Sequence, residues 1–101
     1  MSDDFWDVAA PLLAEGIIDE GTIMGGPCLR SAGEFVGMPH HKGPGIVVKL
    51  PRDRVDALIA LGDGRSFAPA GKVFREWVLV EAFDEGGWQD LLRESVKFVN
   101  P

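Results

Sequence analysis

The chain has 101 residues, 46% of them hydrophobic and 26% charged, with a formal net charge of −6. This size favours one domain, residues 1–101, because domains most often contain about 100–150 residues. No apolar run approaches the roughly 20 residues of a membrane-spanning helix, the acidic start is not a secretory signal, and one cysteine excludes an internal disulfide.

Helical spacing of apolar residues predicts a first helix over residues 3–15, with Ser2 as its N-cap. Phe5 and Leu12 belong to the stripe that this helix should bury. Pro11 removes a backbone donor from the helix interior. We therefore expect the helix either to kink at Pro11 or to divide into two short pieces.

Turn-forming residues divide the next part of the chain into three predicted strands. The first covers about Thr22 to Arg30 and is bent or bulged at its glycines. After a turn at 31–33, the second strand covers Glu34 to Pro39. The segment from His40 to Pro44 reads as a hairpin connection, and the third strand covers Gly45 to Leu50, which is rich in β-branched residues.

The second half predicts a helix, two strands and a last helix. Pro51 suits the first position of a helix that continues to about Leu61. A short edge strand is expected at residues 66–68, and the longest strand covers Val73 to Ala82. The last helix covers Glu85 to Val99.

The strand from Val73 to Ala82 has apolar residues on both faces. Strand alternation places Phe74, Val78 and Val80 on one face, and Trp77 and Leu79 on the other. Such a strand is either central and covered on both sides or part of a dimer surface. We therefore expect Trp77 to be buried, as we expect of Trp88 in the last helix, and we expect a homodimer.

The predicted order of elements is α-β-β-β-α-β-β-α. Short turns between neighbouring strands require antiparallel pairing. The fold class is therefore α+β: an antiparallel sheet of about five strands with helices packed on it.

Five short motifs follow one another along the chain, and together they resemble a known family. They are Ile23-Met24-Gly25-Gly26, Gly33-Glu34-Phe35-Val36-Gly37, Val47-Val48-Lys49-Leu50-Pro51, Phe67-Ala68-Pro69-Ala70-Gly71 and Phe74-Arg75-Glu76-Trp77-Val78. Over about Phe5 to Val99, this series is similar to the TfoX N-terminal domain family, in the wider MmcQ/YjbR-like group.

The chain departs from the family pattern at two motifs. The family's Arg-Met-Phe-Gly is replaced by Ile23-Met24-Gly25-Gly26, and Phe74 stands where the family has methionine. The resemblance implies a YjbR-like fold and a stand-alone regulatory domain that associates with proteins. Related YjbR-like proteins have been suggested to bind DNA, so the resemblance also implies DNA as a partner to consider.

Basic residues gather in the middle of this acidic chain. Residues 1–20 hold six acids and no Lys or Arg, whereas residues 42–75 hold seven bases and three acids. A basic face could contact phosphates, although an acidic protein is a poor binder of polyanions. The candidate nucleic-acid contacts in this segment are Lys49, Arg52, Arg54, Arg65, Lys72 and Arg75.

Three other groups suggest chemistry, and each has a simpler structural explanation. His40 and His41 could ligate zinc or copper, but no third ligand is near them in sequence, so an exposed turn is the simpler explanation. Cys28 could be a nucleophile if a histidine approached it, but a lone strand cysteine is usually buried. Glu76 beside Trp77 could be a general acid or base, but an ion pair with Arg75 is the commoner role.

These observations favour a small, non-catalytic cytoplasmic domain that acts in regulation through a protein partner or a homodimer. Weak nucleic-acid binding through residues 42–75 is the competing hypothesis. The sequence predicts no catalytic residue, no metal, no cofactor and no membrane partner.

Overall fold

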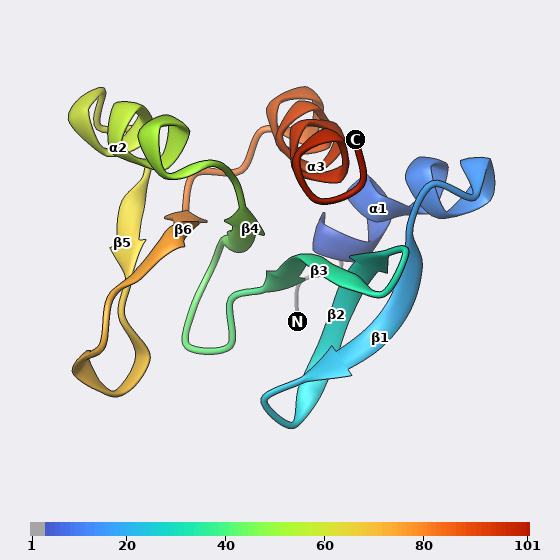
Figure 1. The fold of residues 1–101 in the computed structure, drawn as a ribbon, viewed down its shortest axis with the longest axis horizontal. Helices are drawn as coiled ribbons and strands as arrows, with labels where there is room; N and C mark the ends of the chain where they lie inside the picture. Colours follow the sequence, from blue (N-terminus) through green and yellow to red (C-terminus); the bar gives the residue numbers. More distant parts are fainter. Residues whose placement is uncertain (1–3) are drawn as a thin grey trace.

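The computed structural model describes residues 4–101, which form three helices and a six-stranded antiparallel sheet (Figure 1). The strand order is β1-β2-β3-β4-β6-β5. The α+β prediction is confirmed, with one strand more than expected. The elements are α1 (Asp4–Glu15), β1 (Asp19–Ile23), β2 (Gly26–Ser31), β3 (Glu34–Pro39), β4 (Ile46–Lys49), α2 (Arg52–Ala60), β5 (Arg65–Phe67), a short 3-10 turn (Pro69–Gly71), β6 (Phe74–Val80) and α3 (Glu85–Val99).

The extra strand arises from a tight turn at Met24 and Gly25. These residues have φ angles of 53° and 77°, and such a left-handed pair is typical of a two-residue hairpin turn. β1 and β2 therefore pair as a hairpin, in which Ile23 faces Gly26. The prediction of one bent strand from Thr22 to Arg30 was wrong, because the glycines reverse the chain instead of bulging it.

Helix α1 is one continuous element that contains Pro11. Pro11 is exposed, so water can replace the hydrogen bond that the proline cannot donate. Gly16, with φ of 77°, follows the last turn, and its N–H donates to the carbonyl of Leu13 at 3.1 Å. The predicted N-cap Ser2 lies outside the described residues.

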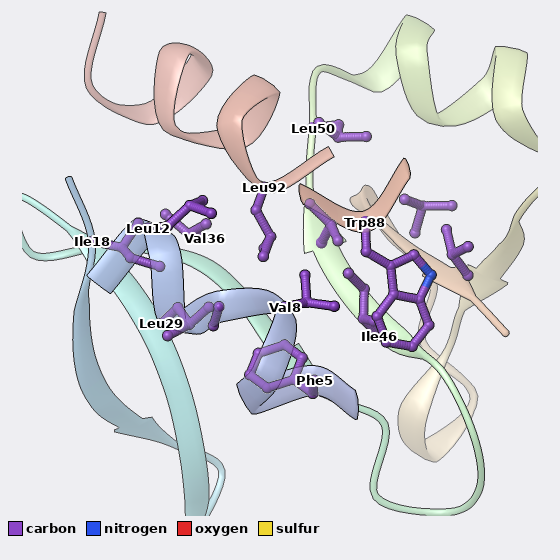
Figure 2. Packing of buried hydrophobic residues seen from close by; sticks show 14 of the residues in the cluster. Phe5, Val8, Leu12, Ile18, Leu29, Val36, Ile46, Leu50, Trp88 and Leu92 are labelled. Atoms are coloured by element: carbon purple, nitrogen blue, oxygen red, sulfur yellow. The ribbon is translucent and has the colours of Figure 1, made fainter. Parts of the chain in front are cut away.

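The main core lies between the helices and one face of the sheet (Figure 2). Val8 and Leu12 from α1 meet Leu92 from α3 and strand residues such as Val36. Trp88 of α3 belongs to this core and is 3% exposed, which confirms its predicted burial. Arg93 of α3 joins Glu15 of α1 through two hydrogen bonds of 2.8 and 2.9 Å, and this contact lowers the pKa of the Glu15 carboxyl.

A second, smaller cluster covers the face of the sheet that the helices leave open. It consists of strand residues, and Trp77 is its central aromatic ring, 9% exposed. The prediction that Trp77 is buried is therefore confirmed. Since one chain covers both faces of β6, its apolar pattern does not require a second copy.

One residue of β6 lies on the face opposite to the expected one. Ser66 pairs with Val78, but the next residue, Phe67, pairs with Phe74, so β6 is irregular between Phe74 and Val78. The irregularity turns Phe74 toward Trp77, with ring centroids 4.9 Å apart. The expectation that Phe74 shares a face with Val78 was wrong because a strand bulge breaks the alternation of side chains.

Within residues 4–101, no helix is long and apolar enough to cross a membrane.

Candidate functional site: a cleft between α2 and α3

A large cavity lies between α2, which stands above β5 and β6, and α3, which stands above β3 and β4 (Figure 1). Its volume is about 600 Å³. This size is within the range of about 300–1,000 Å³ that is usual for ligand pockets. Leu58 from α2 and Leu91 and Trp88 from α3 give the cleft an apolar component.

The charged lining of the cleft is mainly acidic. Two arginines and five acids contribute to it, so its formal charge is −3. Arg54 Nε bonds Glu94 Oε2 across the cleft at 2.7 Å, and Arg65 Nε bonds Glu81 Oε1 at 2.8 Å. The remaining carboxylates form no ion pair within residues 4–101 and carry the excess negative charge; they are Asp63, Asp84 and Asp90.

The turn after α2 builds one rim of the cleft. The N–H groups of Asp63 and Gly64 both donate to the carbonyl of Leu58, which closes the helix and carries Asp63 to the rim. A side chain at position 64 would meet Val78, since an ideal Cβ there lies 2.6 Å from Val78 Cγ2. Glycine therefore lets the turn approach β6 closely.

The start of α3 builds the opposite rim. Asp84 precedes the helix, and its carbonyl accepts the N–H of Trp88 at 2.7 Å. A carboxylate at this position is favoured by the positive end of the helix dipole. The indole N–H of Trp88 donates to the carbonyl of Ala82 at 3.0 Å, and Phe83 contacts the ring edge-on. These contacts fix the indole beside the cleft.

The structure divides the predicted basic residues between two places. Arg54 and Arg65 line the acidic cleft, where each is paired with a glutamate. Residues 49–52 lie beside residues 75–77, because Lys49 pairs with Trp77 and the Leu50 N–H donates to the Glu76 carbonyl. Lys49, Arg52 and Arg75 therefore lie near the start of α2. Arg65 pairs with Leu79, close to the end of β6. Lys72 follows the 3-10 turn.

The residues considered for nucleophilic or acid–base chemistry do not come together. Cys28 is fully buried, and this burial raises the pKa of its thiol. Neither Cys28 nor the exposed Glu76 lines the acidic cleft or either of two smaller cavities among residues 4–101. The described residues also contain no group of three or more His, Cys, Asp or Glu that could hold a metal ion. His40 and His41 do line one cavity together, on another part of the surface.

Comparison with known proteins gives no match for this chain among family models, curated proteins or solved structures.

The acidic cleft was not among the sites expected from the sequence. Its carboxylates are spread over residues 63–94 and come from a turn, a strand end and a helix. The net charge of −4 over residues 76–101 was the one signal that pointed toward this part of the molecule.

Proposed function

We propose that the protein is a small, non-catalytic cytoplasmic domain that acts in regulation by binding a protein partner, as its resemblance to the TfoX N-terminal domain family implies. The observation that carries the proposal is the acidic cleft between α2 and α3. Its volume is about 600 Å³, and its lining combines negative charge with apolar surface.

The cleft best fits a basic segment that also contains an apolar residue. Asp63, Asp84 and Asp90 form no ion pair within residues 4–101, although the charge of Arg93 acts on Asp90. Arginine can bind such carboxylates through two N–H donors at once. Leu58 and Leu91 offer apolar contact to the neighbouring residue. Electrostatic attraction of this kind mainly speeds association and selects the partner by charge.

A pair of synthetic peptides tests the proposal. We expect a blocked peptide with two arginines on either side of a leucine to bind in a calorimetric titration at low salt. A peptide of the same length with glutamates in place of the arginines should not bind. Replacement of Asp90 by asparagine should weaken binding of the basic peptide about three- to tenfold, because one close charge pair contributes on the order of 1 kcal/mol.

Glu20→Gln is the matched control for this experiment, since it removes one exposed carboxylate on β1, away from the cleft. We expect this variant to bind the basic peptide as well as the parent protein. Equal weakening by both variants would mean that the peptide responds only to the overall negative charge, and would contradict a specific role of the cleft.

The second candidate function is weak binding of nucleic acid. Lys49, Arg52, Lys72 and Arg75 support it, because none of them forms an ion pair within residues 4–101. The six acids of residues 1–20 and the acidic cleft oppose it. Four unpaired cations provide few phosphate contacts, so any binding should be independent of sequence and sensitive to salt.

We expect fluorescence anisotropy with two unrelated DNA duplexes to show the same weak binding, which disappears above roughly 0.2 M salt. Replacement of Arg52 and Arg75 by glutamate should abolish it at low salt. Arg54→Gln serves as the control, because Arg54 is already paired with Glu94 and should contribute little. Tight binding to one duplex that persists at high salt would instead favour a nucleic-acid module.

A further inference from the structure

A second cavity, of about 220 Å³, is lined by four residues whose side chains carry a thioether sulfur or an imidazole ring. It borders the cluster that covers the helix-free face of the sheet, which it contacts through Met38 and Leu79. The four side chains come from two separate parts of the chain. They are Met24, Met38, His40 and His41.

The course of the backbone explains why these residues border one cavity. Met24 is the first of the two left-handed residues in the β1–β2 turn. Met38 belongs to β3, and His40 follows two residues later, just after the end of the strand. His41 packs against the same β1–β2 hairpin: an ideal Cβ at Gly26 would lie 2.6 Å from its ring atom Cε1. Because Gly26 has no side chain, the imidazole of His41 can lie against it. This places His41 beside the turn that carries Met24.

One of the two histidines is already held in the tautomer that a metal ligand needs. Nδ1 of His40 lies 3.1 Å from the carbonyl oxygen of Pro44. A carbonyl only accepts hydrogen bonds, so Nδ1 carries a proton, and in the neutral ring Nε2 then keeps its lone pair. A backbone carbonyl commonly orients metal-binding histidines in this way.

We propose that Met24, Met38, His40 and His41 form a binding site for Cu(I). Thioether and imidazole groups are soft or intermediate ligands and select Cu(I) over hard cations. The residues that line the cavity include no carboxylate, so it lacks the ligands that Mg²⁺ and Ca²⁺ prefer. The histidine pair has no third ligand near it in sequence, but in the fold two methionines line the same cavity.

Lys42 also lines the cavity, and its positive charge opposes a bound cation. Its side chain is exposed, so the ammonium group can extend into water. The proposal therefore predicts the direction of one change in affinity: Lys42→Gln should bind Cu(I) more tightly than the parent protein.

The experiment is an anaerobic titration with Cu(I), in which the chelator bathocuproine disulfonate competes with the protein. We expect one equivalent of Cu(I) to be retained. Met24→Leu and His41→Gln should each weaken binding at least tenfold, and both positions are exposed, so these variants should fold normally. Cys28→Ala is the control for a thiolate site and should leave the affinity unchanged, because Cys28 is fully buried and outside the cavity.

A spectroscopic measurement makes the test independent of affinity. With the methionine methyl groups labelled by ¹³C, one equivalent of Cu(I) should shift the resonances of both Met24 and Met38. The proposal would be overturned if the chelator removed all Cu(I), if the double variant of Met24 and His41 bound as tightly as the parent protein, or if Cys28→Ala abolished binding. Loss of binding in the peptide experiment at the acidic cleft would leave this site untouched, since the two cavities share only Leu79.

Discussion

Replacement of Trp77 by alanine is expected to lower the free energy of unfolding by about 3–5 kcal/mol, which is usual for a buried aromatic residue. Its ring stacks on Phe35 with centroids 4.2 Å apart and an interplanar angle of 16°. It also contacts Phe67 at 5.5 Å and Phe74 at 4.9 Å. No helix covers this face within residues 4–101, so loss of the indole leaves the cluster without its central group.

The total stability of a domain of this kind is about 5–15 kcal/mol, so the loss should be obvious in urea denaturation followed by circular dichroism. Val73→Ala is the matched control, since Val73 is 49% exposed just before β6. We expect it to change stability by less than about 1 kcal/mol. Equal midpoints for Trp77→Ala and the parent protein would show that the helix-free face is not a packed core.

Replacement of Gly45 by alanine is expected to have the second large effect. Gly45 has a φ of 118°, a conformation that costs other residues about 1–3 kcal/mol. An added Cβ would also lie 2.7 Å from the carbonyl oxygen of Val80 and 2.9 Å from Cα of Glu81. Both atoms belong to the backbone, so no side chain can move aside. The loop between β3 and β4 must then shift. This shift should weaken the hydrogen bond from His40 N–H to the Gly45 carbonyl.

Gly43→Ala in the same loop is the control for this prediction. Gly43 is not among the glycines with positive φ, and its nearest neighbour to an added Cβ is 3.9 Å away. Differential scanning calorimetry should show a clearly lower melting temperature for Gly45→Ala. The melting temperature of Gly43→Ala should be almost the same as that of the parent protein. Similar melting temperatures for the two variants would mean that the loop adapts to a side chain at position 45.

The sequence predicts most of the fold because its local signals agree with one another. β-branched residues mark β4, Pro51 marks the start of α2, and the apolar stripe of α3 includes Trp88 and Leu92. The missed hairpin depended on Met24, which adopts a left-handed conformation that propensities do not assign to methionine. The position of Phe74 depended on a bulge that forms only when β5 pairs with β6.

The candidate site could not be predicted because it depends on how α2 and α3 stand relative to each other. Arg54 and Glu94 are 40 residues apart in sequence, yet they bond across the cleft. Nearness in sequence suggested that Arg54 and Arg52 share one basic surface. In the structure Arg54 is paired inside the acidic cleft, whereas Arg52 is exposed and unpaired within the described residues.

The indole N–H resonances of the tryptophans test most directly whether the acidic cleft is the binding site. The Trp88 indole N–H donates to Ala82 beside the cleft, whereas Trp77 belongs to the cluster on the opposite face of the sheet. In ¹H–¹⁵N spectra recorded during titration with the basic peptide, we predict that the Trp88 resonance shifts progressively and the Trp77 resonance stays in place. A shift of Trp77 alone, or no shift of Trp88 at saturating peptide, would contradict binding in the cleft.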